Sequence, residues 1–186
     1  MITLDDRKAM RLTDHFTRED FLRSDSAVRL GIDNTPPAEI EPRLLTLAYA
    51  AESIRAAAGA QPTYISSGYR CPDLNAFVGG AMTQESLRIV IGTSRIDEVV
   101  AVAQARLNRG RYDEHDSGHM ACWCLDMTCP PHTPVELIGI VRYAGIPFDQ
   151  LIQEGTWMHW SGDPRARGIV LTAHFGDVKT VYTWGS

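Results

Sequence analysis

Four short runs of β-branched and aromatic residues follow one another in the C-terminal part of the chain, and they constrain its fold more than any other feature. In order, they read FDQLIQE, WMHWS, GIVLTAHF and KTVYTW. Glycine, aspartate and proline separate the runs, which is typical of strands joined by tight turns. Such a succession of short strands favours an antiparallel sheet.

Two segments with helical periodicity accompany these strands. Residues 38–59 carry apolar side chains three and four positions apart and end at a glycine. Residues 133–145 begin with Thr133 and have a glutamate three positions later, a pair that predicts a helix N-terminus. Residues 62–70 and 121–129 are two further predicted strands. Helices first, then strands mixed with a helix, predict an α+β fold with an antiparallel sheet and flanking helices.

Composition excludes several classes of function. The net charge of −5 and the absence of a basic block argue against nucleic acid as a partner. No stretch approaches the roughly 18 apolar residues of a membrane helix, so we expect no membrane insertion. The N-terminus lacks the apolar core of a signal peptide, which predicts synthesis in a cytoplasm. Four cysteines in 186 residues do not make a disulfide scaffold.

The stretch SGHMACWCLDM, residues 117–127, suggests a metal site of one of two kinds. A closed thiolate site would use Cys122, Cys124, Cys129 and His132. Its Cys-x-Cys spacing on a predicted strand differs from the usual zinc knuckle. The same cysteines could instead be small buried residues. A disulfide between Cys71 and either Cys122 or Cys124 is a further alternative.

An open metal site would use a different set of residues. Six residues separate His119 from Asp126, a spacing that suits a turn followed by a strand. His159, in WMHWS, is the third candidate ligand. Three protein ligands with one open position are typical of catalytic zinc. Glu154 ends the run FDQLIQE, and a carboxylate beside such an ion can move a proton between attacking water and a leaving amine.

Several stretches, in the same order, resemble the M15 family of zinc peptidases. SGHMACWCLD is similar to the family motif Ser-x-His-x-x-Gly-x-Ala-x-Asp. The other similar stretches are HFTREDFLRSDSAVRLGIDNTPP, ISSGYRCPDLNAFVGG, TPVELIGIVRYAGIPFDQLIQE and WMHWS. The family includes D-alanyl-D-alanine carboxypeptidases and phage L-alanyl-D-glutamate endolysins, and it shares a fold with Hedgehog signalling domains. The similarity is greatest to its small phage-associated branch.

This resemblance implies a role for each matching residue. His119, Asp126 and His159 are the implied zinc (Zn2+) ligands, and Glu154 is the implied general base and acid. Arg70, in SGYR, occupies the position of an arginine that holds the carbonyl or developing oxyanion of the scissile amide. Ser117 either contacts the substrate or caps a local turn.

The implied activity is hydrolysis of peptidoglycan stem peptides, at the cell wall or as part of a phage particle. The sequence departs from the family at Cys122 and Cys124, which replace its glycine and alanine. It also carries an apparent insertion at about residues 81–116, within an expected single domain of residues 1–186. These departures leave open an alternative, a structural or assembly protein of a phage particle with a retained metal site. Its partners would be other phage virion proteins.

Overall fold

The computed structural model describes residues 10–76, 78, 117–175 and 180–185. Five helices lie in this part of the chain: α2 (Arg18–Leu22), α3 (Asp25–Leu30), α4 (Arg43–Ala57), α5 (Pro72–Ala76) and α8 (Pro134–Tyr143). None of them has the length and apolar character needed to cross a membrane. The predicted insertion at residues 81–116 lies outside the described residues.

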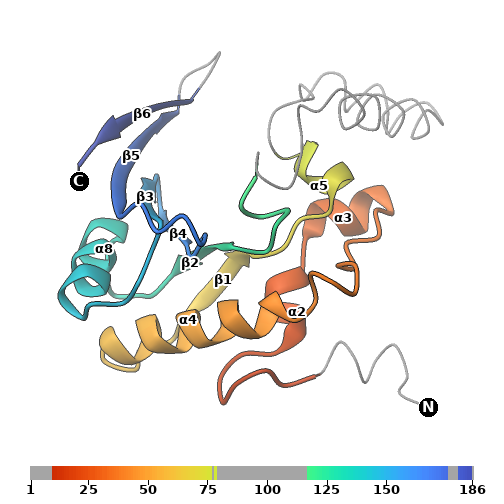
Figure 1. Cartoon of the computed structure of the whole chain (residues 1–186), viewed down its shortest axis with the longest axis horizontal. Helices are drawn as coiled ribbons and strands as arrows, with labels where there is room; N and C mark the ends of the chain where they lie inside the picture. Colours follow the sequence, from red (N-terminus) through yellow and green to blue (C-terminus); the bar gives the residue numbers. More distant parts are fainter. Residues whose placement is uncertain (1–9, 77, 79–116, 176–179, 186) are drawn as a thin grey trace.

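The two longer helices occupy the segments where helical periodicity predicts them. α8 begins with a capping box. The Thr133 hydroxyl oxygen accepts a hydrogen bond from the backbone N–H of Glu136, and the backbone N–H of Thr133 donates to the Glu136 carboxylate. α4 begins after Pro42, a few residues later than its apolar pattern, and buries Leu47 and Ile54 completely. α4 packs against α8, and α8 packs against two strands of the sheet (Figure 1).

Six strands form one mixed sheet in the order β1-β2-β4-β3-β5-β6. They are β1 (Tyr64–Ser67), β2 (Cys124–Thr128), β3 (Gln150–Glu154), β4 (Trp157–Ser161), β5 (Ile169–Phe175) and β6 (Thr180–Trp184). The helices and this sheet confirm the α+β prediction. The prediction of a purely antiparallel sheet is wrong, because β3 and β5 pair in parallel.

The position of β4 explains the parallel pair. A two-residue turn joins β3 to β4, and β2 occupies the other edge of β4. Both edges of β4 are therefore occupied. Residues 162–168 lead the chain from the end of β4 to the other side of β3, where β5 pairs with the free edge of β3. β4 runs antiparallel to β3, and β5 runs in the direction opposite to β4. β5 therefore runs parallel to β3.

The two faces of the sheet have different chemistry. On one face, Leu125 and Met127 of β2 are fully buried in the core with side chains of α4 and α8. On the opposite face, Cys124 and Asp126 alternate with them and line a cleft. The period of two along β2 thus separates the apolar core from the polar site.

Candidate metal centre and active-site cleft

Two histidines and one aspartate meet on the polar face of the sheet. Asp126 of β2 lies directly opposite His159 of β4 in the antiparallel register, and His119 lies in the turn that precedes β2. All three residues are buried, and one potential ligand atom from each lies within 4.8 Å of the others. The structure therefore brings together the three predicted metal ligands.

Hydrogen bonds fix the orientation of His119. Its Nδ1 lies 2.7 Å from the backbone oxygen of Gly68, and a ring nitrogen that faces a carbonyl must carry the proton and donate it. The other ring nitrogen, Nε2, is then unprotonated and lies 3.5 Å from Oδ2 of Asp126. A carbonyl that receives the second N–H is the usual support of a histidine that binds metal.

Asp126 is the centre of the cluster. Its Oδ1 lies 2.8 Å from Nδ1 of His159, and its Oδ2 accepts a hydrogen bond of 2.8 Å from the Arg70 guanidinium. Burial alone would raise the pKa of this carboxyl, but contacts with His119 and His159 outweigh burial and hold the pKa well below its ordinary value. Asp126 is therefore an anion despite its burial.

The two histidines respond differently to this anion. Burial lowers the pKa of His119, and the nearby Asp126 only partly opposes that effect. Burial also disfavours the charged form of His159, but the neighbouring Cys124 and Asp126 raise its pKa well above the ordinary value. In this state His119 is neutral and could bind a cation, whereas His159 holds a proton that an incoming cation would replace.

The donor set fits zinc. Two imidazole nitrogens and one carboxylate give three ligands, and the cluster opens on a cleft that leaves room for a fourth. Mixed nitrogen and oxygen ligation of this kind suits zinc better than magnesium or calcium, which prefer oxygen ligands. The arrangement is that of an open site and not of a closed structural one.

Glu154 lies at the end of β3 and lines the same cleft. The indole N–H of Trp157 donates to its Oε2 at 3.0 Å, and the Trp157 ring packs against Phe175. Burial raises the pKa of Glu154, although His159 and the Trp157 hydrogen bond oppose the rise. The orienting role of Trp157 is not among the roles predicted from the sequence. This role could have been predicted from the short turn between β3 and β4, because such a turn places Trp157 opposite Glu154.

Arg70 and Ser117 also line the cleft, which has a volume of about 650 Å³. The Nε of Arg70 donates to Ser67 Oγ at 2.8 Å, so one side of the guanidinium is held by β1 and the other by Asp126. The hydroxyl of Ser117 donates to the side-chain oxygen of buried Asn75 at 3.1 Å. All six predicted site residues thus surround one cleft.

The cysteines do not form the alternative sites. All four are buried free thiols, so the disulfide from Cys71 is not present. Among the described residues, the one cluster that could hold a metal is the His–Asp–His set, and the closed thiolate site is therefore not formed. Cys124 lines the cleft. Cys122 does not share its face, because it sits in the turn before β2 with φ 55° and joins the core.

Comparison with known families gives one match. The family model described as Peptidase M15 matches residues 14–90. No curated protein and no solved structure matches the chain. The matched segment includes Arg70 and ends before the three candidate ligands. This part of the chain is similar to Peptidase M15, which supports a hydrolase that acts on peptides.

Proposed function

We propose that this protein is a zinc-dependent metallopeptidase that hydrolyses amide bonds in the stem peptides of peptidoglycan. The observation that carries the proposal is the convergence of His119, Asp126 and His159 in one cleft with Glu154. The match of residues 14–90 to Peptidase M15 supports the reaction class. The similarity of SGHMACWCLD and WMHWS to the motifs of that family supports zinc and the cell-wall substrate.

Glu154 moves the proton in this proposal. Zinc, when bound, supplies Lewis-acid chemistry, because it polarises a carbonyl oxygen and lowers the pKa of water. One oxygen of Glu154 accepts a proton from the attacking water, while Trp157 holds the other oxygen in place. Glu154 then gives that proton to the nitrogen of the leaving amine. A pKa raised toward neutrality suits both steps, since the same group must accept and donate.

Arg70 stabilises charge on the substrate. Its guanidinium is held between Ser67 and Asp126 at the wall of the cleft, so its direction is fixed before a substrate binds. The remaining N–H groups can donate to the carbonyl oxygen of the scissile amide as negative charge develops there. A donor fixed in this way contributes more in the transition state than a mobile one.

Digestion of purified peptidoglycan by the zinc-loaded protein tests this proposal. Wild type should release new amino termini, and Glu154→Gln should release at least about a hundredfold fewer, because the residue that transfers the proton is lost. Both proteins should carry one equivalent of zinc. If both bind zinc and neither cleaves peptidoglycan, the protein is not this enzyme, and a structural role for the metal in a phage particle becomes the better account.

A further inference from the structure

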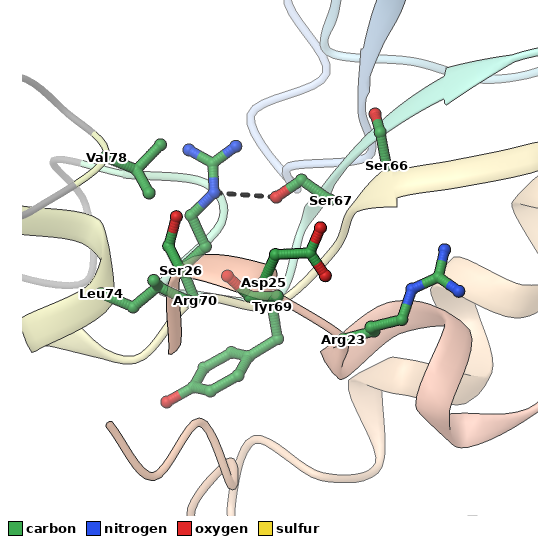
Figure 2. Close-up of a pocket in the computed structure, with 10 residues that line it drawn as sticks. Arg23, Asp25, Ser26, Ser66, Ser67, Tyr69, Arg70, Leu74 and Val78 are labelled. Carbon is green, nitrogen blue, oxygen red and sulfur yellow. Dashed lines mark hydrogen bonds between the residues drawn. The ribbon is translucent and has the colours of Figure 1, made fainter. Parts of the chain in front are cut away.

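A second pocket lies next to the active-site cleft. It has a volume of about 390 Å³ and shares Arg70 and Val78 with the cleft. Its other lining residues come from the link between α2 and α3, from α3 and β1, and from the segment after β1 that includes α5; they are Arg23, Ser24, Asp25, Ser26, Ser66, Ser67, Tyr69 and Leu74 (Figure 2). A substrate whose amide lies beside Arg70 can therefore extend into this pocket.

The pocket contains charges of both signs. Arg23 directly follows α2 and Asp25 begins α3, and both residues are exposed. In the view of Figure 2, the Asp25 carboxylate lies between the side chains of Arg23 and Arg70. No ion pair joins Arg23 to Asp25 in the described part of the chain. The two groups are therefore each able to meet a charge on a ligand.

The wall of the pocket is joined to the metal cluster by hydrogen bonds. Ser66 Oγ donates to the backbone oxygen of Asp126 at 3.2 Å. Ser67 Oγ accepts from Arg70, which in turn donates to the Asp126 carboxylate. The two serines and the candidate ligand are thus held as one unit on neighbouring strands. A group bound in the pocket is held at a fixed position relative to the reacting amide.

We infer that this pocket binds the zwitterionic end of a substrate side chain, an ammonium and a carboxylate on one carbon. The inference deepens the proposed peptidase function and rests on it. The carboxylate would pair with Arg23, the ammonium with Asp25, and the serine hydroxyls would complete the hydrogen bonds. A simple anion would be repelled by Asp25, and a simple cation by Arg23 and Arg70. The volume is typical of small-ligand pockets, which range over roughly 300–1,000 Å³.

Two stem pentapeptides of peptidoglycan test the inference. One carries diaminopimelic acid at its third position, whose side chain ends in a zwitterion. The other carries lysine, whose side chain ends in an ammonium alone. Wild type should have a lower KM for the first. Arg23→Ala should raise that KM about tenfold with kcat unchanged, and it should lower the KM for the lysine peptide, because the arginine that repels its ammonium is gone. Asp25→Asn should raise both KM values.

Arg142→Ala is the control, because it removes an exposed arginine of α8 outside the pocket. It should behave as wild type with both peptides. The same peptides are also titrated into the Glu154→Gln variant, with and without Arg23→Ala. Equal cleavage and equal binding of both peptides, whatever residue stands at position 23, would overturn the inference and leave the peptidase standing. Arg23-dependent binding without cleavage by wild type would support the pocket and reject the peptidase.

Discussion

Cys122 shows how one residue can occupy a conformation that its side chain disfavours. Its φ is 55°, and its side chain is fully buried in the core. A residue other than glycine in this left-handed region costs about 1–2 kcal/mol. Glycine is the residue that the similar family motif has at this position, and the backbone conformation explains why. Burial raises the pKa of the Cys122 thiol to about 12, so it is also a poor nucleophile.

Replacement of Cys122 by glycine and by alanine separates conformation from packing. Both substitutions remove the buried sulfur, but only glycine relieves the positive φ. We expect Cys122→Gly to be more stable to urea than Cys122→Ala by about 1 kcal/mol. Equal stability of the two variants, or a more stable alanine variant, would show that the turn before β2 does not impose this conformation.

At the scale of elements, the turn before β2 packs closely against β2 itself. A Cβ added at Gly118 would lie 2.0 Å from Sγ of Cys124, so the turn that carries His119 approaches β2 as closely as a glycine allows. Gly139, on α8, has no atom within 4 Å of the same added Cβ. The placement of His119 therefore depends on a small residue at position 118.

Gly118→Ala should weaken both folding and metal binding. Overpacking of this kind typically costs about 1–3 kcal/mol, and displacement of His119 should raise the zinc dissociation constant at least about tenfold. Gly139→Ala, the matched control, should leave metal binding unchanged. Cys124→Ala combined with Gly118→Ala removes the clash and should restore the affinity. Normal zinc affinity in Gly118→Ala alone would contradict the close fit, as measured by isothermal titration.

At the scale of the whole molecule, an ion pair secures the chain crossing that makes β3 and β5 parallel. Asp149 is 1% exposed and accepts hydrogen bonds from the backbone N–H and guanidinium of Arg167. Its own backbone bonds to Ser161 and Ile169, the ends of the crossing. The hydrogen bond from Arg167 is the main reason that the pKa of Asp149 is lowered.

This ion pair predicts a dependence of stability on pH. Because the folded-state pKa of Asp149 is below its ordinary value, its contribution is complete at neutral pH. The contribution is lost as pH falls from the ordinary range of an aspartate through the lower folded-state pKa. Asp149→Asn should therefore destabilise the metal-free protein at pH 7 more than at pH 3 in urea unfolding. Asp14→Asn, at an exposed position, should have little effect at either pH. An equal loss for Asp149→Asn at both pH values would contradict the prediction.

Local patterns in the sequence predicted more of this structure than long-range ones. The pair Thr133 and Glu136 predicted the start of α8, and the predicted strand over residues 121–129 contains β2. The parallel pairing of β3 and β5 could not be predicted, because it follows from β2 occupying one edge of β4. The left-handed conformation of Cys122 is likewise set by the turn around it and not by its own preference.

The zinc affinity of a small set of variants tests the central claim most directly. Isothermal titration of wild type should give one zinc ion per chain. His159→Ala should bind zinc at least about a hundredfold more weakly, because one of three ligands is lost. Glu154→Gln should bind zinc as wild type does, because Glu154 lines the cleft without belonging to the cluster. Undiminished zinc binding by His159→Ala, at a stoichiometry of one, would contradict the assignment of the metal centre.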